Sequence, residues 1–443
     1  MKSITQLITD KKTGRAHTEE ELQWLVENYT NDRLPDYQMS AWLMAVCWRG
    51  MTFEETKALT LAMMRSGACL QLNGAGRPLV DKHSTGGVAD TTTLVLAPLL
   101  AAAGAGVAKM SGRGLGFTGG TIDKLESIPG FSATLQEEQF LALLQKQGLA
   151  LTAQSASIAP ADGKMYALRD VTATVDSLPL IAASVMSKKL AAGAEHILLD
   201  VKVGQGAFMQ TKEAAVELAR YMVAIGLGAG RNVKAVLTSM EQPLGSAVGN
   251  ALEVAEAIEI LRGYGPLRLR QVCLRLAAEA LCLAGLASTQ EKANVKLLAL
   301  LDSGKALECF RQWILSQGGA DIVTTPALLP QAVLKEDLLS PLSGYVQQVQ
   351  ARIIGEASVA LGAGRRYKGE PLDLAAGLVL ACEQGSFVQK GQKLATLYAD
   401  SAEKMAAAKH MLSAAFVLGE EQSVSRPDIL GWVDAAGFHA DSE

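Results

Sequence analysis

Two glycine-rich stretches decide how this chain is organised: DKHSTGGVADTTT at residues 81–93 and KMSGRGLGFTGGTIDKLE at residues 109–126. Each adjoins a predicted strand or helix end and combines glycines with hydroxyl groups and lysines. Backbone N–H groups, hydroxyls and ammonium groups brought together in this way bind oxyanions. The sequence therefore predicts a phosphate site built from both stretches, and the rest of the chain must supply the group that reacts with the phosphate.

Composition argues against several classes of protein. Of 443 residues, 49% are hydrophobic and 19% are charged, which is typical of packed globular domains. The net charge of −4 gives no general attraction for nucleic acid or membranes. The six cysteines are scattered without a CxxC pair, which argues against disulfides and zinc. No signal peptide or membrane span is apparent, so we expect a soluble cytoplasmic protein.

The first half of the chain changes character twice. Residues 1–67 are predicted to be helical, because capping pairs such as Thr18 with Glu21 open amphipathic runs. Residues 79–155 alternate short apolar strands with helices, as in a parallel α/β domain, and a helix is expected at 91–103. Helices are then predicted again within residues 156–194.

The α/β pattern resumes after this helical segment. Strands are expected at 197–203 and 234–240 with a helix at 211–225 between them, and a later helix is expected to be capped by Asn250. From Ser340 onward, four β-like runs are separated by glycine turns, namely SGYVQQV, ARIIGEA, GLVLACEQ and KLATLYA. This pattern predicts a small α+β C-terminal domain.

One helical segment carries a possible ligand-binding spacing. Ser184 and Lys188 are four residues apart and lie on one helix face, and Arg169 stands fifteen residues before Ser184. This face could present a hydroxyl and an ammonium group to one polar ligand. Taken alone, the spacing favours the simpler interpretation of a solvated helix end.

His83 is the candidate acid or hydrogen-bond donor. It stands between a lysine and a hydroxyl at a strand end, and its near-neutral ordinary pKa suits proton transfer to a leaving group. Asp123 and Glu126 are interpreted as helix-start and ion-pairing residues instead. The GxGxxG pattern at Gly114 is not interpreted as a dinucleotide fingerprint, because no long strand precedes it and no acid follows a second strand.

These blocks, together with YALRDVTATVDS and DVKVGQGAFM, resemble the pyrimidine and thymidine nucleoside phosphorylases in sequence, order and spacing. The resemblance implies a reversible phosphorolysis in which phosphate attacks C1′ of a pyrimidine nucleoside and releases the base and a (deoxy)ribose 1-phosphate. It implies phosphate as co-substrate and no organic cofactor. The implied phosphate-site residues are Lys82, His83, Ser84, Thr93, Lys109, Met110, Ser111 and Thr121. The implied base-site and catalytic residues are His83, Arg169, Ser184 and Lys188.

The resemblance also implies a bound potassium ion and a substrate range. The matching ion-site positions are Ala89, Thr91, Leu244, Ala247 and Glu256. Lys109 occupies a position where thymidine-restricted relatives usually carry Met, which implies that uridine is accepted as well as thymidine. Three other departures are Phe117, where relatives usually have His, Gln205, where they usually have Ser, and Ala89, where they usually have Gly; a carbonyl ligand at Ala89 would survive that change.

The implied architecture has three parts and a catalytic cleft. An α-domain of residues 1–67 and 160–193 would face an α/β phosphate-binding domain with a mixed sheet, formed by residues 75–155 and 195–335. Residues 340–443 would form a hammerhead-like α+β domain. Relatives are homodimers through the helical domain, and we expect the same here. Closure of the cleft would use hinges near residues 74–78, 155–163 and 191–196.

Three alternatives stay open on the sequence alone. A thymidine-restricted phosphorylase would have the same fold and site. A phosphoribosyltransferase of the anthranilate type would share the architecture but would need magnesium and an acidic pair for pyrophosphate. A non-catalytic carrier is the third, because the C-terminal β runs are similar to biotinyl or lipoyl domains, although the attachment turn is missing.

Overall fold

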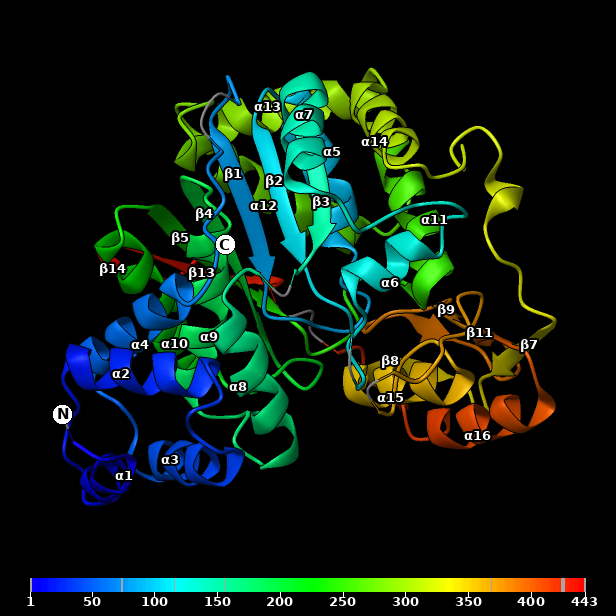
Figure 1. Cartoon of the computed structure of the whole chain (residues 1–443). Helices are drawn as coiled ribbons and strands as arrows, with labels where there is room; N and C mark the ends of the chain where they lie inside the picture. The colour runs from blue at the N-terminus through cyan, green and yellow to red at the C-terminus, as the bar shows by residue number, and fades with distance from the viewer. Residues whose placement is uncertain are drawn as a thin grey trace.

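The computed structural model describes residues 2–72, 75–114, 116–155, 157–367, 369–423 and 427–441. Figure 1 shows a helical part formed by the N-terminus, a central sheet covered by helices, and a separate C-terminal part below the sheet. Within the described ranges, no helix is long and apolar enough to cross a membrane. The expected hinge residues Gly74 and Ala156 lie outside the described residues.

The helical part combines two distant segments. Its helices are α1 (Ile4–Lys12), α2 (Glu19–Thr30), α3 (Asp36–Arg49), α4 (Phe53–Arg65), α8 (Pro160–Val171) and α9 (Leu178–Ala191). One buried cluster contains Trp42 and Leu59 from the first segment together with Met165 and Leu180 from the second. The two segments therefore share one hydrophobic core, although about a hundred residues separate them.

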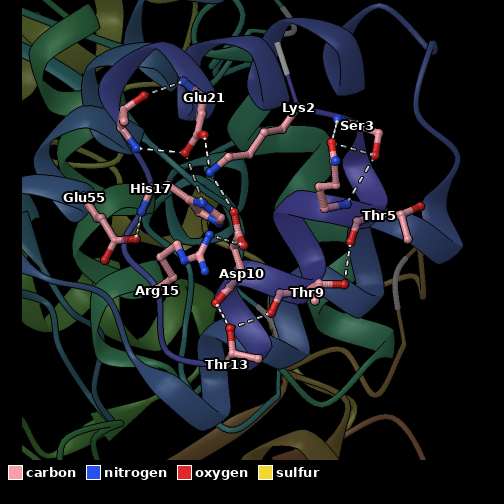
Figure 2. Close-up of polar contacts among 12 residues, drawn as sticks. Lys2, Ser3, Thr5, Thr9, Asp10, Thr13, Arg15, His17, Glu21 and Glu55 are labelled. Atoms are coloured by element: carbon pink, nitrogen blue, oxygen red, sulfur yellow. Dashed lines mark hydrogen bonds and ion pairs between the residues drawn. The ribbon is translucent and has the colours of Figure 1, made fainter.

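Polar contacts join the first four helices, and Figure 2 draws those that involve His17, Glu21 and Glu55. Glu55 of α4 accepts hydrogen bonds from Lys11 Nζ at 2.5 Å and from the backbone N–H of His17 at 2.8 Å. Trp42 of α3 donates to His17 Nε2 at 3.0 Å. Burial, assisted by the charge of Lys11, lowers the pKa of His17 below its ordinary value. His17 is thus a neutral core residue that links α3 to α4.

The central sheet has seven strands in the order β14-β13-β5-β4-β1-β2-β3. Its five parallel strands are β1 (Leu79–Ser84), β2 (Gly106–Ser111), β3 (Leu149–Ala153), β4 (His196–Val203) and β5 (Asn232–Ser239). Strand β13 (Ile429–Asp434) runs antiparallel to β5 and pairs with β14 (Gly437–His439). The sheet is therefore mixed, as the resemblance implies.

Helices cover both faces of this sheet, which explains its nearly continuous apolar strands. In β4, Leu198 joins the core that contains α5 (Thr92–Ala102) and α12 (Leu267–Leu283), while Leu199 joins the core that contains α10 (Lys212–Gly228). The remaining elements of this part are α6 (Thr121–Glu126), α7 (Glu137–Gln147), β6 (Ala247–Val248), α11 (Asn250–Leu261), α13 (Gln290–Asp302), α14 (Lys305–Ser316) and the 3-10 helix Pro326–Leu328.

The C-terminal part is built from two small sheets and two helices. Its elements are β7 (Leu334–Leu339), β8 (Gly344–Val349), α15 (Ala351–Leu361), β9 (Gly377–Leu380), β10 (Phe387–Val388), β11 (Lys393–Ala399), α16 (Ala402–Leu412) and β12 (Phe416–Gly419). The sheets have the strand orders β10-β8-β12 and β6-β9-β11-β7.

The expected domain boundaries at residues 335 and 340 are not those of the structure, because some strands of one part pair within the sheet of another. Strand β6 of the α/β segment pairs with β9, whereas β13 and β14 leave the C-terminal part and extend the central sheet. Strand β7 already belongs to the C-terminal sheet. Such pairings join residues far apart in sequence, so composition along the chain does not reveal them.

Two local predictions were also wrong. ARIIGEA is not a strand but the start of α15, whose residues Ile354, Ala357, Ser358 and Leu361 are buried at helical spacing. The quoted run was too short to distinguish this spacing from that of a strand. Asn250 is the first residue of α11 and Gly249 is the cap; the Asn250 amide instead donates to the carbonyl of Ala363 at 2.9 Å.

Candidate active site

A cavity of about 620 Å³ lies between the central sheet and the helical part. One wall contains His83, Ser84 and Ser111, which stand at the carboxyl ends of the parallel strands β1 and β2. The opposite wall contains Arg169 from α8 and Lys188 from α9. Ligand sites of open α/β sheets lie outside the carboxyl ends of their strands, so the cavity is in the position where such a site is expected.

The strand wall carries most of the residues predicted for phosphate. The cavity is lined by His83, Ser84, Thr93, Lys109, Met110, Ser111 and Thr121. Thr93 stands in the first turn of α5, whose N-terminal end favours a negative charge. The loop between β2 and α6 also contributes Gly112, Gly114, Thr118, Gly119 and Gly120. The two glycine-rich stretches therefore meet around one space.

Lys82 differs from the expectation. It is not among the described residues that line the cavity, and its ammonium group lies instead 2.8 Å from Asp200 and 2.5 Å from Thr92 Oγ1. Alternate side chains of a strand point to opposite faces, so Lys82 and His83 diverge. Burial alone would lower the pKa of Lys82, but Asp200 and Asp90 raise it above its ordinary value. Lys82 is therefore a buried cation beneath the loop.

Asp90 and Lys124 hold the first glycine-rich loop, which joins β1 to α5 and is called the first loop below. Asp90 accepts from Ser84 Oγ at 2.5 Å, and the Asp90 carbonyl accepts from Lys124 Nζ at 2.8 Å. Lys124 also pairs with Glu253 of α11 at 2.6 Å. Burial alone would raise the pKa of Asp90, but Lys202, Lys82 and Lys124 hold it well below its ordinary value. The loop is thus shaped by buried charges before any ligand binds.

Lys109 lies at the centre of the strand wall. Its ammonium group contacts the carbonyl of Lys82 and lies 3.4 Å from Asp81 Oδ1. Asp81 also pairs with Lys189 of α9 at 2.7 Å. Burial lowers the pKa of Lys109 to about 7, against the opposing effect of Asp81. The Lys109 ammonium group therefore titrates near neutral pH.

His83 is neutral at physiological pH. Burial, together with the charges of Lys189, Lys109 and other nearby lysines, lowers its pKa well below the ordinary value. A neutral imidazole still donates one N–H hydrogen bond. His83 can therefore hydrogen-bond a ligand in the cavity, but it does not carry the second proton of a general acid in this state.

The helical wall brings together the residues whose spacing was ambiguous. Lys188 Nζ lies 3.0 Å from Ser184 Oγ and 2.5 Å from Asp162 Oδ2. Arg169 donates to the carbonyls of Thr174, Val175 and Leu180 at 2.8–3.1 Å and is buried. These bonds use three of its five N–H groups. The simpler interpretation of a solvated helix end is wrong, because Ser184, Lys188 and Arg169 all line the cavity.

Sequence reasoning missed several lining residues. Tyr166 precedes Arg169 by three residues and shares its helix face, a spacing that could have identified it. Lys188 lies 5.9 Å from the centre of the Tyr166 ring. Phe208 lies in a turn after β4 and is half exposed at the cavity. No pattern in the sequence pointed to Phe208, which stands between Ala207 and Met209.

Phe117 and Gln205 are departures from the pattern that the resemblance implies. The Phe117 ring packs 6.2 Å from that of Phe208, and the Arg352 guanidinium lies 5.1 Å from its centre. Gln205 is exposed. Phe117 therefore makes aromatic and cation–π contacts in the loop between β2 and α6.

The predicted potassium positions gather beside the first loop. Glu256 Oε1 accepts from the N–H groups of Ser246 and Ala247 at 2.8 and 2.9 Å, while its buried Oε2 has no hydrogen-bond partner among the described residues. Burial raises the pKa of Glu256 to about 7. The carbonyl of Ala89 already accepts from Thr91 and Gly245. The unpartnered Glu256 oxygen is the observation that fits a cation.

Ala89 has a left-handed backbone with φ 54°, a conformation that favours glycine. The resemblance implies Gly at this position, which suits the same conformation. The Ala89 side chain therefore adds one methyl group in a conformation that glycine adopts more readily, at the position of the predicted carbonyl ligand.

Comparison with known proteins identifies the family. Residues 5–67 match the family described as "Glycosyl transferase family, helical bundle domain", residues 76–307 match "Glycosyl transferase family, a/b domain", and residues 345–419 match "Pyrimidine nucleoside phosphorylase C-terminal domain". The three matches follow the helical, central and C-terminal parts of the structure.

Whole-chain relatives agree with these matches. Pyrimidine-nucleoside phosphorylases from Geobacillus stearothermophilus and Bacillus subtilis are each 50% identical over 398 residues, which is 90% of this chain and 92% of theirs. An anthranilate phosphoribosyltransferase from Thermus thermophilus has a similar fold, with a TM-score of 0.58 and 19% identity over 70% of this chain and 99% of that one. The chain therefore belongs to the pyrimidine-nucleoside phosphorylase family.

Proposed function

We propose that this protein catalyses the reversible phosphorolysis of pyrimidine nucleosides to the free base and (deoxy)ribose 1-phosphate. The observation that carries the proposal is the cavity, which places the hydroxyl- and lysine-bearing strand wall opposite the Arg169, Ser184 and Lys188 wall. The identity of about 50% to pyrimidine-nucleoside phosphorylases over most of both chains supports the same reaction.

The strand wall would hold the phosphate. Ser84, Thr93, Ser111 and Thr121 offer hydroxyl donors, and the loops offer backbone N–H groups. A phosphate oxygen forms the new bond to C1′ while the bond from C1′ to the base nitrogen breaks, and the electron pair leaves with the base. The bound dianion also stabilises the positive charge that develops on the sugar, so no covalent enzyme intermediate is required.

The helical wall would hold the base. Lys188 and the N–H groups of Arg169 that make no carbonyl bond would donate to the base carbonyls, and Ser184 would reach the N3 side. These donors stabilise the negative charge that develops on the leaving base. His83 would add one neutral hydrogen bond to a base oxygen, because its lowered pKa leaves it uncharged.

The main enzymatic alternative is a phosphoribosyltransferase, since its fold is shared. The co-substrate distinguishes the two reactions. Phosphorolysis requires inorganic phosphate and a nucleoside, whereas phosphoribosyl transfer requires phosphoribosyl pyrophosphate and magnesium. We expect turnover with phosphate alone. Turnover only with phosphoribosyl pyrophosphate would overturn the proposal.

Lys109 would bind phosphate or ribose oxygens and extend the substrate range to uridine. Because the pKa of Lys109 is lowered to about 7, its cationic fraction falls as the pH rises above that value. Sulfate keeps its charge over this range and serves as a phosphate mimic. We predict that the inhibition constant of sulfate increases several-fold between about pH 7 and pH 9.

The matched variant for this prediction is Lys109→Met, in which the pH dependence of sulfate inhibition should disappear. The same variant should lose more turnover of uridine than of thymidine. A pH profile that stays unchanged in Lys109→Met would remove Lys109 from the phosphate site.

A monovalent cation, potassium, would be held by Glu256 together with backbone carbonyls at Ala89, Leu244 and Ala247 and by Thr91. Such an ion would supply positive charge that orders the first loop. The pKa of Glu256 is higher in the folded protein than in the unfolded chain. The folded state therefore loses stability as the pH rises from the pKa of an unfolded glutamate through about 7. A bound cation offsets this loss, so potassium stabilisation should grow with pH through the same range.

Thermal unfolding tests this prediction. Potassium should raise Tm by several degrees at about pH 8 and by less at about pH 6, whereas choline at equal ionic strength should not. Glu256→Gln should abolish the difference. Equal stabilisation of wild type and Glu256→Gln by potassium would place the ion elsewhere.

The protein would act as a homodimer through the helical part. On α3, Tyr37 and Trp48 are 74% and 81% exposed, and Ala41 and Met44 lie exposed on the same face. Such an apolar stripe on a helix is typical of a subunit interface. Sedimentation velocity should give a species of twice the chain mass, and Trp48→Glu should shift it to monomer. A monomeric wild type at micromolar concentration would overturn this assignment.

A further inference from the structure

We propose that Arg365, in the C-terminal part of the chain, is a positioning residue that shapes the phosphate loop between β2 and α6. The inference rests on the proposed function, because it assigns a role within the same site. It gives the C-terminal part a task in the reaction beyond packing.

The phosphate loop is folded tightly on itself. A side chain at Gly120 would place its Cβ 2.0 Å from the backbone N of Gly114, so the two ends of the loop approach as closely as glycine allows. Asp123, in the first turn of α6, accepts from the Gly114 N–H at 2.7 Å. Asp123 is 2% exposed. This buried carboxylate therefore fixes the start of the loop against the helix that follows it.

Arg365 holds both members of this contact. Its guanidinium donates to Asp123 Oδ1 at 2.8 Å and to the Gly114 carbonyl at 3.3 Å. The Arg365 backbone carbonyl accepts from the Gly116 N–H at 3.1 Å. A single residue from a separate part of the chain thus bonds the loop through its side chain and its backbone. Charge-assisted bonds to a buried carboxylate are among the stronger hydrogen bonds of proteins.

Neighbouring residues of the C-terminal part close around the same loop. A Cβ at Gly355 of α15 would lie 2.6 Å from the Phe117 carbonyl, so only glycine allows this approach. The Arg352 guanidinium lies 5.1 Å from the centre of the Phe117 ring. Described loop residues from Gly114 to Phe117 are therefore supported by the segment that runs from α15 to Arg365.

Arg365 acts through the loop and not on the substrate, because it is not among the described residues that line the cavity, whereas Gly114 and Thr118 are. Without Arg365, Asp123 would keep the Arg113 side chain at 3.3 Å, but that guanidinium is half exposed and also pairs with Glu126. The loop would then sample more conformations, and its donors would meet phosphate less often in the binding geometry. The affinity for phosphate should fall, while the helical wall that would hold the base is unchanged.

The test compares how variants of the full-length protein change the KM for phosphate and the KM for uridine. Arg365→Ala should raise the KM for phosphate about tenfold or more and leave the KM for uridine within about twofold. Arg365→Lys should recover part of the loss, because it restores the charge beside Asp123. The control is Arg366→Ala, since Arg366 is exposed and pairs with Glu370 at 2.6 Å.

Each outcome has a defined meaning. An unchanged KM for phosphate in Arg365→Ala, or an equal rise in both KM values, would overturn the positioning role and leave a general packing role. If Arg365→Ala does not fold, as judged by its thermal transition, Arg365→Lys is measured instead. A rise in its KM for phosphate without a rise in its KM for uridine supports the positioning role, and the absence of that difference overturns it. If wild type itself shows no phosphate-dependent turnover, the proposed function fails first, and the two failures are thereby distinguished.

Discussion

Replacing Lys188 by Met is expected to lower kcat/KM for uridine by about 10² to 10³ while the protein stays folded. Lys188 lines the cavity, and its ammonium group is held at 2.5 Å from Asp162 and 3.0 Å from Ser184. Because both contacts are made before a ligand binds, the ammonium group is already oriented when negative charge develops on the leaving base.

The structure supplies a reason for the size of this effect. Asp162 is buried, its Oδ1 has no partner among the described residues, and its Oδ2 pairs with Lys188. Removing Lys188 leaves the Asp162 carboxylate unpaired in the helical wall. There it would repel the negative charge on the leaving base that Lys188 would stabilise. The loss should therefore exceed that of one neutral donor.

A matched control is Lys164→Met. Lys164 lies on α8 in the same part of the protein and pairs with Asp32 at 2.5 Å, but it is not among the described residues that line the cavity. Its replacement should change kcat/KM by less than about twofold, as expected for an exposed ion pair. Equal activity of Lys188→Met and wild type would remove Lys188 from the base site.

Asp200→Asn is expected to lower the free energy of unfolding by about 3–5 kcal/mol. Asp200 is fully buried in β4, and its carboxylate lies 2.8 Å from both Lys82 and Lys202 and 2.6 Å from Thr238 Oγ1. Neutralising it leaves two buried ammonium groups with reduced compensation. Denaturant-induced unfolding and Tm would measure the loss.

The control for this prediction is Asp400→Asn, which breaks a surface pair with Lys404 at 2.7 Å and should change stability by at most about 1 kcal/mol. Because Asp200 holds Lys82 beneath the first loop, Asp200→Asn should also weaken phosphate binding. A change in unfolding free energy equal to that of Asp400→Asn would show that the buried cluster contributes little.

The sequence predicted those features that depend on local pattern. The helix at α5, the strands β4 and β5 and the helix at α9 follow from hydrophobic periodicity and capping, and the structure contains them close to the expected bounds. The Arg169, Ser184 and Lys188 cluster was ambiguous from spacing alone. The family resemblance predicts a base site there, and all three residues line the cavity.

The features that the sequence did not reveal depend on distant contacts. Lys82 adjoins His83 in sequence, yet it points to Asp200 because neighbouring strand residues face opposite ways. The pairing of β13 with β5 and the contact of Arg365 with Asp123 each join segments about two hundred residues apart or more. No local pattern encodes such contacts.

The most direct test of the account is to incubate the purified protein with uridine, and separately with thymidine, with and without phosphate, and to measure free base together with sugar 1-phosphate. We predict equimolar release of base and sugar 1-phosphate from both nucleosides, and only when phosphate is present. Release from thymidine alone would contradict the role of Lys109 in substrate range. No phosphate-dependent release from either nucleoside would contradict the central claim that the two walls of the cavity bind phosphate and a pyrimidine nucleoside.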